Sequence, residues 1–249
     1  MNIAVCVKQT PDTTTKVTIA GDGKSVADDG IQWIINPYDE FAIEEALKLT
    51  EKNGGEVTIV TLGSASAEKT IREALAMGAH KAVRINVERV PDDPLVTAKA
   101  LAETLKDGNF DLIFLGRQAI DDDHGQMPQL VATALDLPCV TVVIGLEIDG
   151  SSGTATREIE GGSERVSFGL PAVIGANRKL NEPRYRSLKG IMQAKKKSID
   201  VKEVSLTAPK MVIEKIAYPP AKDAGKIFTN GAEDAAEVVR LLREEAKVI

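Results

Sequence analysis

The sequence predicts an α/β fold built on a mostly parallel β-sheet, followed by a C-terminal arm. Through about residue 145, short apolar runs alternate with amphipathic segments of helical length. The runs are continuous stretches of Val, Ile, Leu and Ala, which is typical of strands covered on both faces. Strands that alternate with helices favour a parallel sheet. The alternation ends near residue 197, and this predicts the arm.

The elements of the first half follow in order. Strands are predicted at residues 3–7, 57–62, 82–85, 112–115 and 140–144. Helices are predicted at 37–51, 66–77, 94–106 and 127–135, and a small hairpin at 16–26. Asn36 is expected to cap the first helix, with Pro37 at its first position. Gly78 and Gly108 are expected to end the second and third helices.

The second half changes character. Residues 146–170 predict a β-meander with glycine-rich turns that extends the sheet or covers one edge. A final helix is predicted at 233–247, with Asn230 and Gly231 as cap candidates. The predicted domains are therefore 1–197 and an arm at 198–249. Because the arm cannot form its own core, we expect it to wrap a partner, and the alternative is that it folds back on its own domain.

The composition narrows the protein class. Hydrophobic content of 43% and charged content of 27% are ordinary for a soluble globular protein. Apolar runs are strand-sized, far from the ~20 residues of a membrane span, so no membrane insertion is expected. The N-terminus leads directly into a strand and resembles no signal peptide, which favours a cytoplasmic protein. Cys6 and Cys139 are expected to be buried thiols, and their spacing predicts no metal site.

Residues 116–127, GRQAIDDDHGQM, lie between a predicted strand and a predicted helix. Ligands of parallel sheets bind beyond the carboxyl ends of the strands. This loop lies at such an end, and so do the segments 8–12, 36–39 and 63–65. Gly116 permits close backbone approach, and a helix that begins near 125–127 directs N–H groups toward an anion. The acids at 121–123 could instead cap the helix, bind ribose or hold a cation. On spacing alone, a solvated turn explains the loop equally well.

Residues 178–197, here called the basic segment, stand out on an acidic chain. Eight of these twenty residues are Lys or Arg and Glu182 is the sole acid, whereas the whole chain has a net charge of −6. Apolar and aromatic residues lie among them: Leu180, Tyr185, Leu188, Ile191 and Met192. A basic collar around an apolar anchor suits docking on an acidic protein surface. A solvated charged loop is the alternative, and a pI near 5.2 argues against nucleic acid.

Five collinear segments closely resemble the electron transfer flavoprotein beta-subunit family. They are AVCVKQTPD, INPYDEFAIEEAL, TIREALAMGA, GRQAIDDDHGQM and LNEPRYRSLKGIMQAKKK. The resemblance covers most of residues 1–200 and implies a nucleotide-binding sheet of the adenine nucleotide alpha-hydrolase type. It also implies an electron carrier subunit rather than an enzyme, paired with an alpha subunit that holds most of the FAD. The flavin would carry the redox chemistry.

The resemblance further implies a nucleotide site, occupied by AMP or, in electron-bifurcating members, by a second FAD. The positions carried over are Cys6, Asn36, Pro37, Tyr38, Asp39, Leu62, Gly63, Asp121, Asp122, Asp123, His124, Gly125, Gln126 and Met127. The loop DDDHGQM is shorter than the AMP-type pattern and lacks the Thr and Gly-Pro of the bifurcating pattern. Its aspartates and GQM favour AMP.

Partner contacts are implied in the same way. Leu188 matches the anchor of a loop that docks acyl-CoA dehydrogenases, with Tyr185 beside it and Lys195, Lys196 and Lys197 flanking it. Electrons would pass on to a quinone-linked membrane oxidoreductase, as in fatty acid oxidation. Glu158 matches a carboxylate that pairs with an arginine of the alpha subunit. Thr13 stands where relatives pack an aromatic residue near the flavin.

Two other functions stay open. A nucleotide alpha-hydrolase or universal-stress type protein would have a Gly/Ser-rich phosphate loop after the first strand, where this chain has KQTPDTT. A non-catalytic scaffold would use the basic segment alone to bind partners. A yellow heterodimer on co-purification would separate both from the flavoprotein.

Overall fold

The computed structural model describes residues 1–222 and 224–249, which form two compact units, Met1–Lys215 and Ile216–Ile249. The main sheet contains β1 (Asn2–Cys6), β4 (Glu56–Gly63), β5 (Lys81–Asn86), β6 (Leu112–Gly116), β7 (Cys139–Asp149), β8 (Ser152–Ile159), β9 (Gly162–Gly169), β10 (Ala172–Ala176) and β11 (Asp200–Glu203). A second, two-stranded sheet pairs β2 (Gln9–Pro11) with β3 (Trp33–Ile35). The helices are α1 (Pro37–Asn53), α2 (Glu68–Met77), α3 (Pro94–Leu105), α4 (Met127–Leu135), α5 (Leu188–Ala194) and α6 (Ala235–Glu244), with the 3-10 turns η1 (Ala65–Ala67) and η2 (Gly231–Asp234).

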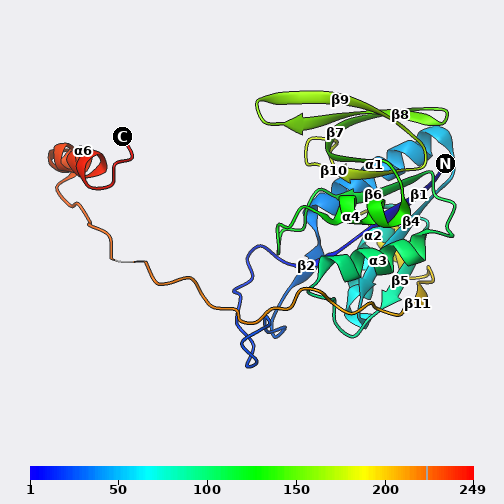
Figure 1. The fold of residues 1–249 in the computed structure, drawn as a ribbon, viewed down its shortest axis with the longest axis horizontal. Coiled ribbons are helices and arrows are strands. Elements are labelled where there is room, and N and C mark those ends of the chain that lie inside the picture. The colour runs from blue at the N-terminus through cyan, green and yellow to red at the C-terminus, as the bar shows by residue number, and fades with distance from the viewer. Residues whose placement is uncertain (223) are drawn as a thin grey trace. The chain divides into compact units, whose positions relative to one another are not determined.

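The main sheet of the first unit has the strand order β11-β5-β4-β1-β6-β10-β7-β8-β9 (Figure 1). Every pair from β11 to β7 is parallel. The pairs β7–β8 and β8–β9 are antiparallel and form the predicted meander, which extends the sheet. The predicted α/β class with a mostly parallel sheet is therefore confirmed.

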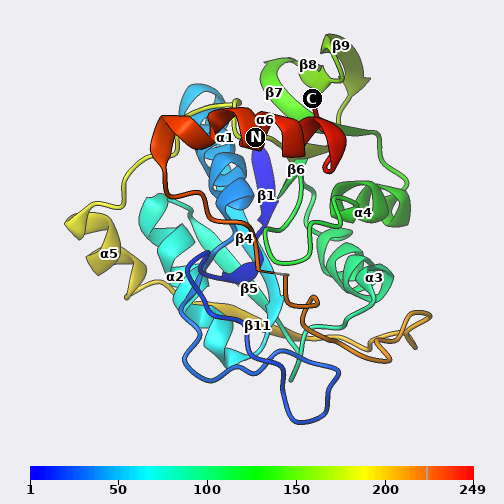
Figure 2. The same cartoon turned by 90° about the vertical axis from the view of Figure 1, so that its left-hand side faces the viewer.

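Helices cover both faces of this sheet, α1 and α2 on one side and α3 and α4 on the other (Figure 2). Alternate side chains of β1 serve the two sides: Ile3 and Val5 pack with α1 and α2, and Ala4 and Cys6 pack with α3 and α4. All four are buried. This double burial explains why the strand is apolar from Ile3 to Cys6.

Some elements differ from the prediction. The hairpin expected at 16–26 is reduced to one isolated bridge between Ile19 and Val26. The strand expected at 140–144 continues to Asp149, so β7 also provides the first strand of the meander. Four strands were not predicted: β2, β3, β10 and β11. β10 is a buried apolar run of 5 residues that follows Pro171, and β11 is polar and exposed.

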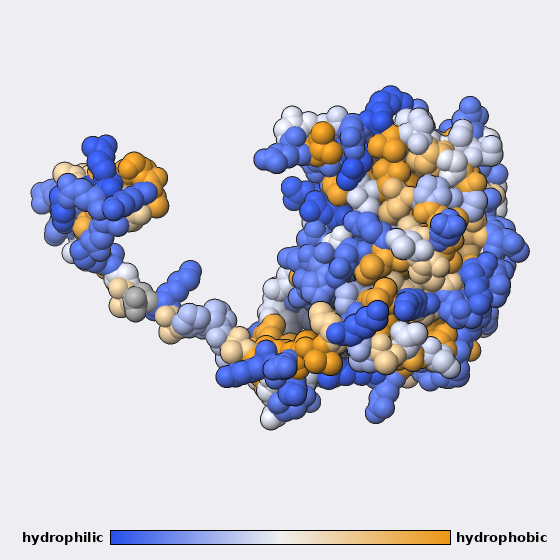
Figure 3. All heavy atoms as spheres, in the orientation of Figure 1, coloured by the Kyte–Doolittle hydropathy of each residue, from blue (hydrophilic) through white to orange (hydrophobic). Residues whose placement is uncertain are grey.

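The start of the arm also differs from the expected residue 198. β11 pairs with β5 in the main sheet, and the first unit continues to Lys215. Within it, Asp93 Oδ2 accepts hydrogen bonds from the backbone of Lys210 and Met211. The second unit contains α6, and Figure 3 shows apolar residues gathered on one side of that helix. Whether the arm wraps a partner stays a prediction.

Two searches of the described residues are relevant to function. No helix within 1–222 or 224–249 is both long and apolar enough to cross a bilayer. The same residues contain no cluster of three or more His, Cys, Asp or Glu side chains arranged to hold a metal ion. Cys6 and Cys139 are free thiols, the first buried and the second half-buried.

Candidate nucleotide site and basic segment

A pocket opens at the carboxyl ends of β1, β4 and β6, beside the starts of α1, α3 and α4. It measures about 830 Å³ when the open solvent at its mouth is included. Aliphatic side chains and prolines line part of it: Val60, Leu62, Pro91, Pro94, Leu101 and Leu115. Polar side chains also line it: Lys8, Asn36, Gln118, Asp122, His124 and Gln126.

Asp39, in the first turn of α1, joins three elements beneath this pocket. Its Oδ2 accepts the Lys8 N–H at 2.8 Å, and its Oδ1 accepts the Gly116 N–H at 2.9 Å and Asn36 Nδ2 at 3.0 Å. Burial raises the pKa of Asp39 to about 7, although the three donors and the Lys8 charge act in the opposite direction. The lining of the pocket therefore includes a carboxyl group whose pKa is raised toward neutral pH.

Gly116 ends β6 against this carboxylate. A Cβ atom here would lie 2.4 Å from Asp39 Oδ1 and 2.7 Å from the Cβ of Tyr38. Only glycine fits so close an approach. The next residue, Arg117, places its guanidinium 5.8 Å from the centre of the Tyr38 ring. The packing of β6 on α1 therefore fixes where the loop 116–127 begins.

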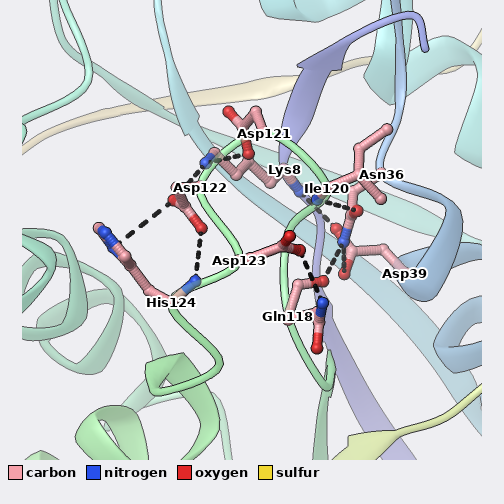
Figure 4. A network of polar contacts seen from close by, with 9 residues as sticks. All are labelled: Lys8, Asn36, Asp39, Gln118, Ile120, Asp121, Asp122, Asp123 and His124. Carbon is pink, nitrogen blue, oxygen red and sulfur yellow. Dashed lines mark hydrogen bonds and ion pairs between the residues drawn. The ribbon is translucent and has the colours of Figure 1, made fainter. Parts of the chain in front are cut away.

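Figure 4 shows that Lys8 orders the acidic part of this loop. Its Nζ lies 2.7 Å from Asp121 Oδ1 and 2.8 Å from Asp122 Oδ2. Burial lowers the pKa of Lys8, but the two carboxylates outweigh burial and the net shift is upward. The His124 N–H donates to Asp122 Oδ1 at 3.1 Å. Two of the three consecutive acids are thus matched by a cation of their own chain.

The end of the loop directs the chain into α4. Asp123 and Gly125 both adopt left-handed backbone conformations, with φ of 51° and 60°. The Asp123 carboxylate accepts a hydrogen bond from Gln118 Nε2 at 2.6 Å. Gln126 and Met127, at the start of α4, line the pocket. The unpaired N–H groups and dipole of a helix start favour an anion at this place.

The expected role of Asn36 as a side-chain helix cap is wrong. Asn36 precedes α1 and Pro37 is at its first position, but the Asn36 side chain makes no capping hydrogen bond. Instead its Nδ2 donates to the carbonyl of Gln118 at 2.9 Å, and its Oδ1 accepts the Ile120 N–H at 3.3 Å. Asn36 therefore connects the start of α1 to the loop 116–127.

The structure brings the predicted nucleotide residues to one edge of the sheet. Those that line the pocket are Cys6, Asn36, Asp39, Leu62, Asp122, His124, Gly125, Gln126 and Met127. Pro37 and Tyr38 begin α1, Gly63 ends β4, and Asp121 and Asp123 lie in the loop 116–127. Burial, aided by the charge of Asp39, raises the pKa of the Cys6 thiol far above its usual range, so Cys6 contributes packing rather than thiolate chemistry.

Several pocket residues were not predicted. Lys8 and Gln118 were not among the residues carried over from the family, although both lie in the segments 8–12 and 116–127 that the strand-end rule selected. Val90, Pro91 and Asp92 belong to the segment after β5, which was left out of the strand-end segments considered. Its high content of Pro and Asp resembles an ordinary surface turn, and only the folded sheet brings it to the pocket.

The basic segment presents an apolar surface. Tyr185 is 98% exposed, Leu188 is 82% exposed and Met192 is 65% exposed. Lys195 and Lys196 are also exposed beside them. Lys197 differs, because its ammonium group donates to the carbonyl of Ala79 and burial lowers its pKa. Its charge is therefore directed toward its own chain rather than toward a docking surface.

Glu158, at the end of β8, already has partners within the chain. Its Oε1 accepts a hydrogen bond from Lys179 Nζ at 2.5 Å and its Oε2 accepts one from Asn177 Nδ2 at 2.9 Å. The Lys179 hydrogen bond lowers the pKa of Glu158 below its usual value. An arginine of another subunit would have to compete with Lys179 for this carboxylate.

These features define an α/β protein with a ligand pocket at the carboxyl edge of a parallel sheet and an exposed basic segment. The family model described as the electron transfer flavoprotein domain matches residues 24–207. Because this match covers well over half of the chain, the protein belongs to the electron transfer flavoprotein family.

Full-length relatives agree with this assignment. The electron transfer flavoprotein subunit beta of Bacillus subtilis (strain 168) is 46% identical, with 100% of both chains covered. The protein of the same name from Syntrophomonas wolfei is 42% identical, with 100% of this chain and 98% of the relative covered. The human protein of that name is 37% identical, with 100% and 99% covered.

Proposed function

We propose that this chain is the beta subunit of a heterodimeric electron transfer flavoprotein and that it binds AMP in the strand-end pocket. The observation that carries the nucleotide proposal is that aliphatic side chains, Lys8, His124 and the start of α4 line one pocket. The aliphatic side chains offer a packing surface for adenine. The start of α4, with Lys8 and His124, offers donors for a phosphate.

FAD, shared with the alpha subunit, supplies the redox chemistry when it is bound. This chain contributes binding and orientation. Thr13, which is exposed in the turn after β2, offers no aromatic ring to stack on a flavin. We therefore propose that the flavin is more open on this side than in relatives that have an aromatic residue there.

The basic segment is the proposed docking surface for acyl-CoA dehydrogenase-type flavoenzymes. Leu188, Tyr185 and Met192 provide the apolar anchor, and Lys195 and Lys196 provide the charge. Electrons then leave for a quinone-linked membrane oxidoreductase, as in cytoplasmic fatty acid oxidation. The second unit would wrap the alpha subunit, and Glu158 would exchange Lys179 for an arginine of that subunit in one arrangement of the flavin domain.

The test is to co-express the chain with its alpha subunit, denature the purified complex and quantify the released nucleotides. One FAD and one AMP per heterodimer are expected. Leu62→Trp should fill the pocket and remove AMP, because Leu62 lines it. Val201→Trp, on exposed β11, is the matched control and should retain AMP. A colourless complex would contradict the flavoprotein function.

The second candidate function is electron bifurcation with a second FAD and NADH. It is favoured by the open mouth of the pocket, through which a ligand larger than AMP could extend. Two FAD and no AMP in the same measurement would select it. Loss of one of those two FAD in Leu62→Trp would then place the second flavin in this pocket.

A further inference from the structure

The amino end of the basic segment is tied to α1 by a partly buried ion pair. Arg184 Nε lies 2.7 Å from Glu44 Oε2, and Arg184 Nη1 lies 2.5 Å from Glu51 Oε1. The Arg184 backbone N–H also donates to Glu44 Oε2 at 3.1 Å. The Glu44 side chain is only 4% exposed. Because one guanidinium holds two carboxylates and one of these is desolvated, this contact is far more specific than a surface ion pair.

A second tie at the same end involves a neutral side chain. Asn181 Nδ2 donates to Glu45 Oε2 at 2.9 Å and to the carbonyl of Phe41 at 3.0 Å. Both acceptors belong to α1: Glu45 is next to Glu44, and Phe41 lies about one turn before it. Residues 181 and 184 are therefore fixed to a single rigid helix.

The carboxyl end of the segment is tied to α2. Arg72 Nη1 donates to the carbonyls of Ala194 at 2.8 Å and of Lys197 at 3.2 Å. Ala194 is the last residue of α5 and Lys197 lies just beyond it, where the last carbonyls of a helix have no intrahelical partner. A cation at a helix C-terminus also interacts favourably with the helix dipole.

Between the two ends, α5 packs directly on α2 (Figure 2). A Cβ atom at Gly190 would lie 2.4 Å from the carbonyl oxygen of Ala76, so only glycine permits this approach. Arg186 Nη1 lies 2.7 Å from Glu73 Oε2 of α2. Ala194 is buried in the same contact. The backbone of the segment is thus held along its length, while Tyr185, Leu188 and Met192 point outward.

We infer that Arg184, Glu44 and Arg72 are positioning residues for docking, because they hold residues 184–197 in one conformation before a partner arrives. This set is called the brace. The inference rests on the proposed docking function of the basic segment. Exposed apolar side chains on a mobile loop would have to be ordered on association, which weakens binding. On a braced backbone, Leu188 is presented in a fixed direction and that ordering is already complete.

The test uses the flavin-loaded heterodimer and an acyl-CoA dehydrogenase that reduces the wild-type complex. Arg184→Gln is expected to speed amide hydrogen exchange across 185–194 and to raise KM for the heterodimer about tenfold, with kcat within about twofold. Arg165→Gln is the matched control, because it breaks the exposed 3.4 Å ion pair with Glu147 on the meander. It should change neither readout.

A double-mutant cycle separates positioning from general destabilisation. If Arg184 acts through Leu188, adding Arg184→Gln to Leu188→Ala should raise KM by less than about twofold beyond Leu188→Ala alone. Two outcomes would overturn the inference but not the docking function. One is that the two substitutions raise KM by factors that multiply, and the other is that Arg184→Gln changes neither amide hydrogen exchange nor KM. An unchanged KM in Leu188→Ala itself would instead overturn the docking function, and the role of the brace with it.

Discussion

The pocket and the basic segment use the same helix in opposite ways. Near the start of α1, Asp39 draws the backbone of β1 and β6 inward and leaves a cavity lined by polar groups. Further along α1, Glu44 holds Arg184 and leaves apolar side chains exposed. Both carboxylates are buried. The difference is the donor, since neutral N–H groups face Asp39 and a guanidinium faces Glu44. Buried acids on one helix therefore organise a recessed site and a projecting one.

The largest effect on stability is expected at Gly116, where β6 approaches α1 closely in the recessed site. Gly116→Ala places a Cβ atom 2.4 Å from Asp39 Oδ1, and overpacking of this kind lowers the free energy of unfolding by about 3 kcal/mol. Gly162→Ala, whose Cβ meets nothing within 4 Å, is the control. Urea unfolding of both variants checks this prediction. Equal stabilities would show that α1 can shift away from β6 without loss.

The projecting site should be broken by removing its anchor and should remain folded. Leu188→Ala is expected to weaken docking by about 2 kcal/mol, or roughly 30-fold in the rate of electron transfer at low concentration. Flavin content and stability should not change, because Leu188 is 82% exposed. Val201→Ala, another exposed apolar residue, is the control. Stopped-flow flavin reduction measures the rates, and equal rates in all three proteins would reject the anchor.

The recessed site should also make the stability depend on pH. The Asp39 carboxyl has an ordinary pKa of 3.8 and a folded value of about 7, so between these values the folded state holds more protons than the unfolded state. Its contribution therefore lowers the free energy of unfolding as pH rises through this window, by at most about 1.4 kcal/mol per unit. Asp39→Asn should remove this slope between pH 5 and 7.

Asp93 provides the control for that measurement. Hydrogen bonds from the backbone of Lys210 and Leu95 lower its pKa, so its contribution is present above its ordinary pKa of 3.8 and is lost at more acidic pH. Asp93→Asn should leave the slope between pH 5 and 7 unchanged. Parallel slopes for wild type and Asp39→Asn would mean that Asp39 is ionised throughout this range.

The smallest effect is expected at Glu158, which belongs to neither site. Glu158→Gln removes an exposed ion pair with Lys179, and pairs of this kind contribute little to stability. The melting temperature of the isolated chain should therefore not change. In the heterodimer, a change in the reduction rate with no change in melting would support its proposed pairing with the alpha subunit. An identical rate would remove Glu158 from the interface.

The sequence was most informative where burial is continuous. The helices and strands with long aliphatic faces, such as β4 and α3, were predicted to within a few residues. β10 and β11 escaped prediction for different reasons. β10 is a buried apolar run of 5 residues, like β6, but it follows the meander with no helix between them. β11 is exposed and polar, so its partner strand rather than its local pattern decides that it is extended.

The pocket was also predicted only in part. The strand-end rule and the family resemblance located the residues that surround the pocket, but not their contacts. Asn36 has the sequence context of a helix cap, yet its amide binds a loop that lies 84 residues away at Ile120. Lys8 likewise forms an ion pair with Asp121, which lies 113 residues away in the sequence. Contacts at such distances depend on the completed sheet and leave no local pattern.

The place of β10 in the sheet has a consequence for how the chain is made. β10 lies between β6 and β7, although both precede it in the sequence. On the ribosome, β1, β4, β5 and β6 can pair as they emerge, but β7 pairs only with β10 and β8 among the described strands. The meander therefore has no place on the sheet until residue 176 has been translated. A nascent chain halted before that point would expose the unpaired edge of β6, the kind of edge that chaperones must shield.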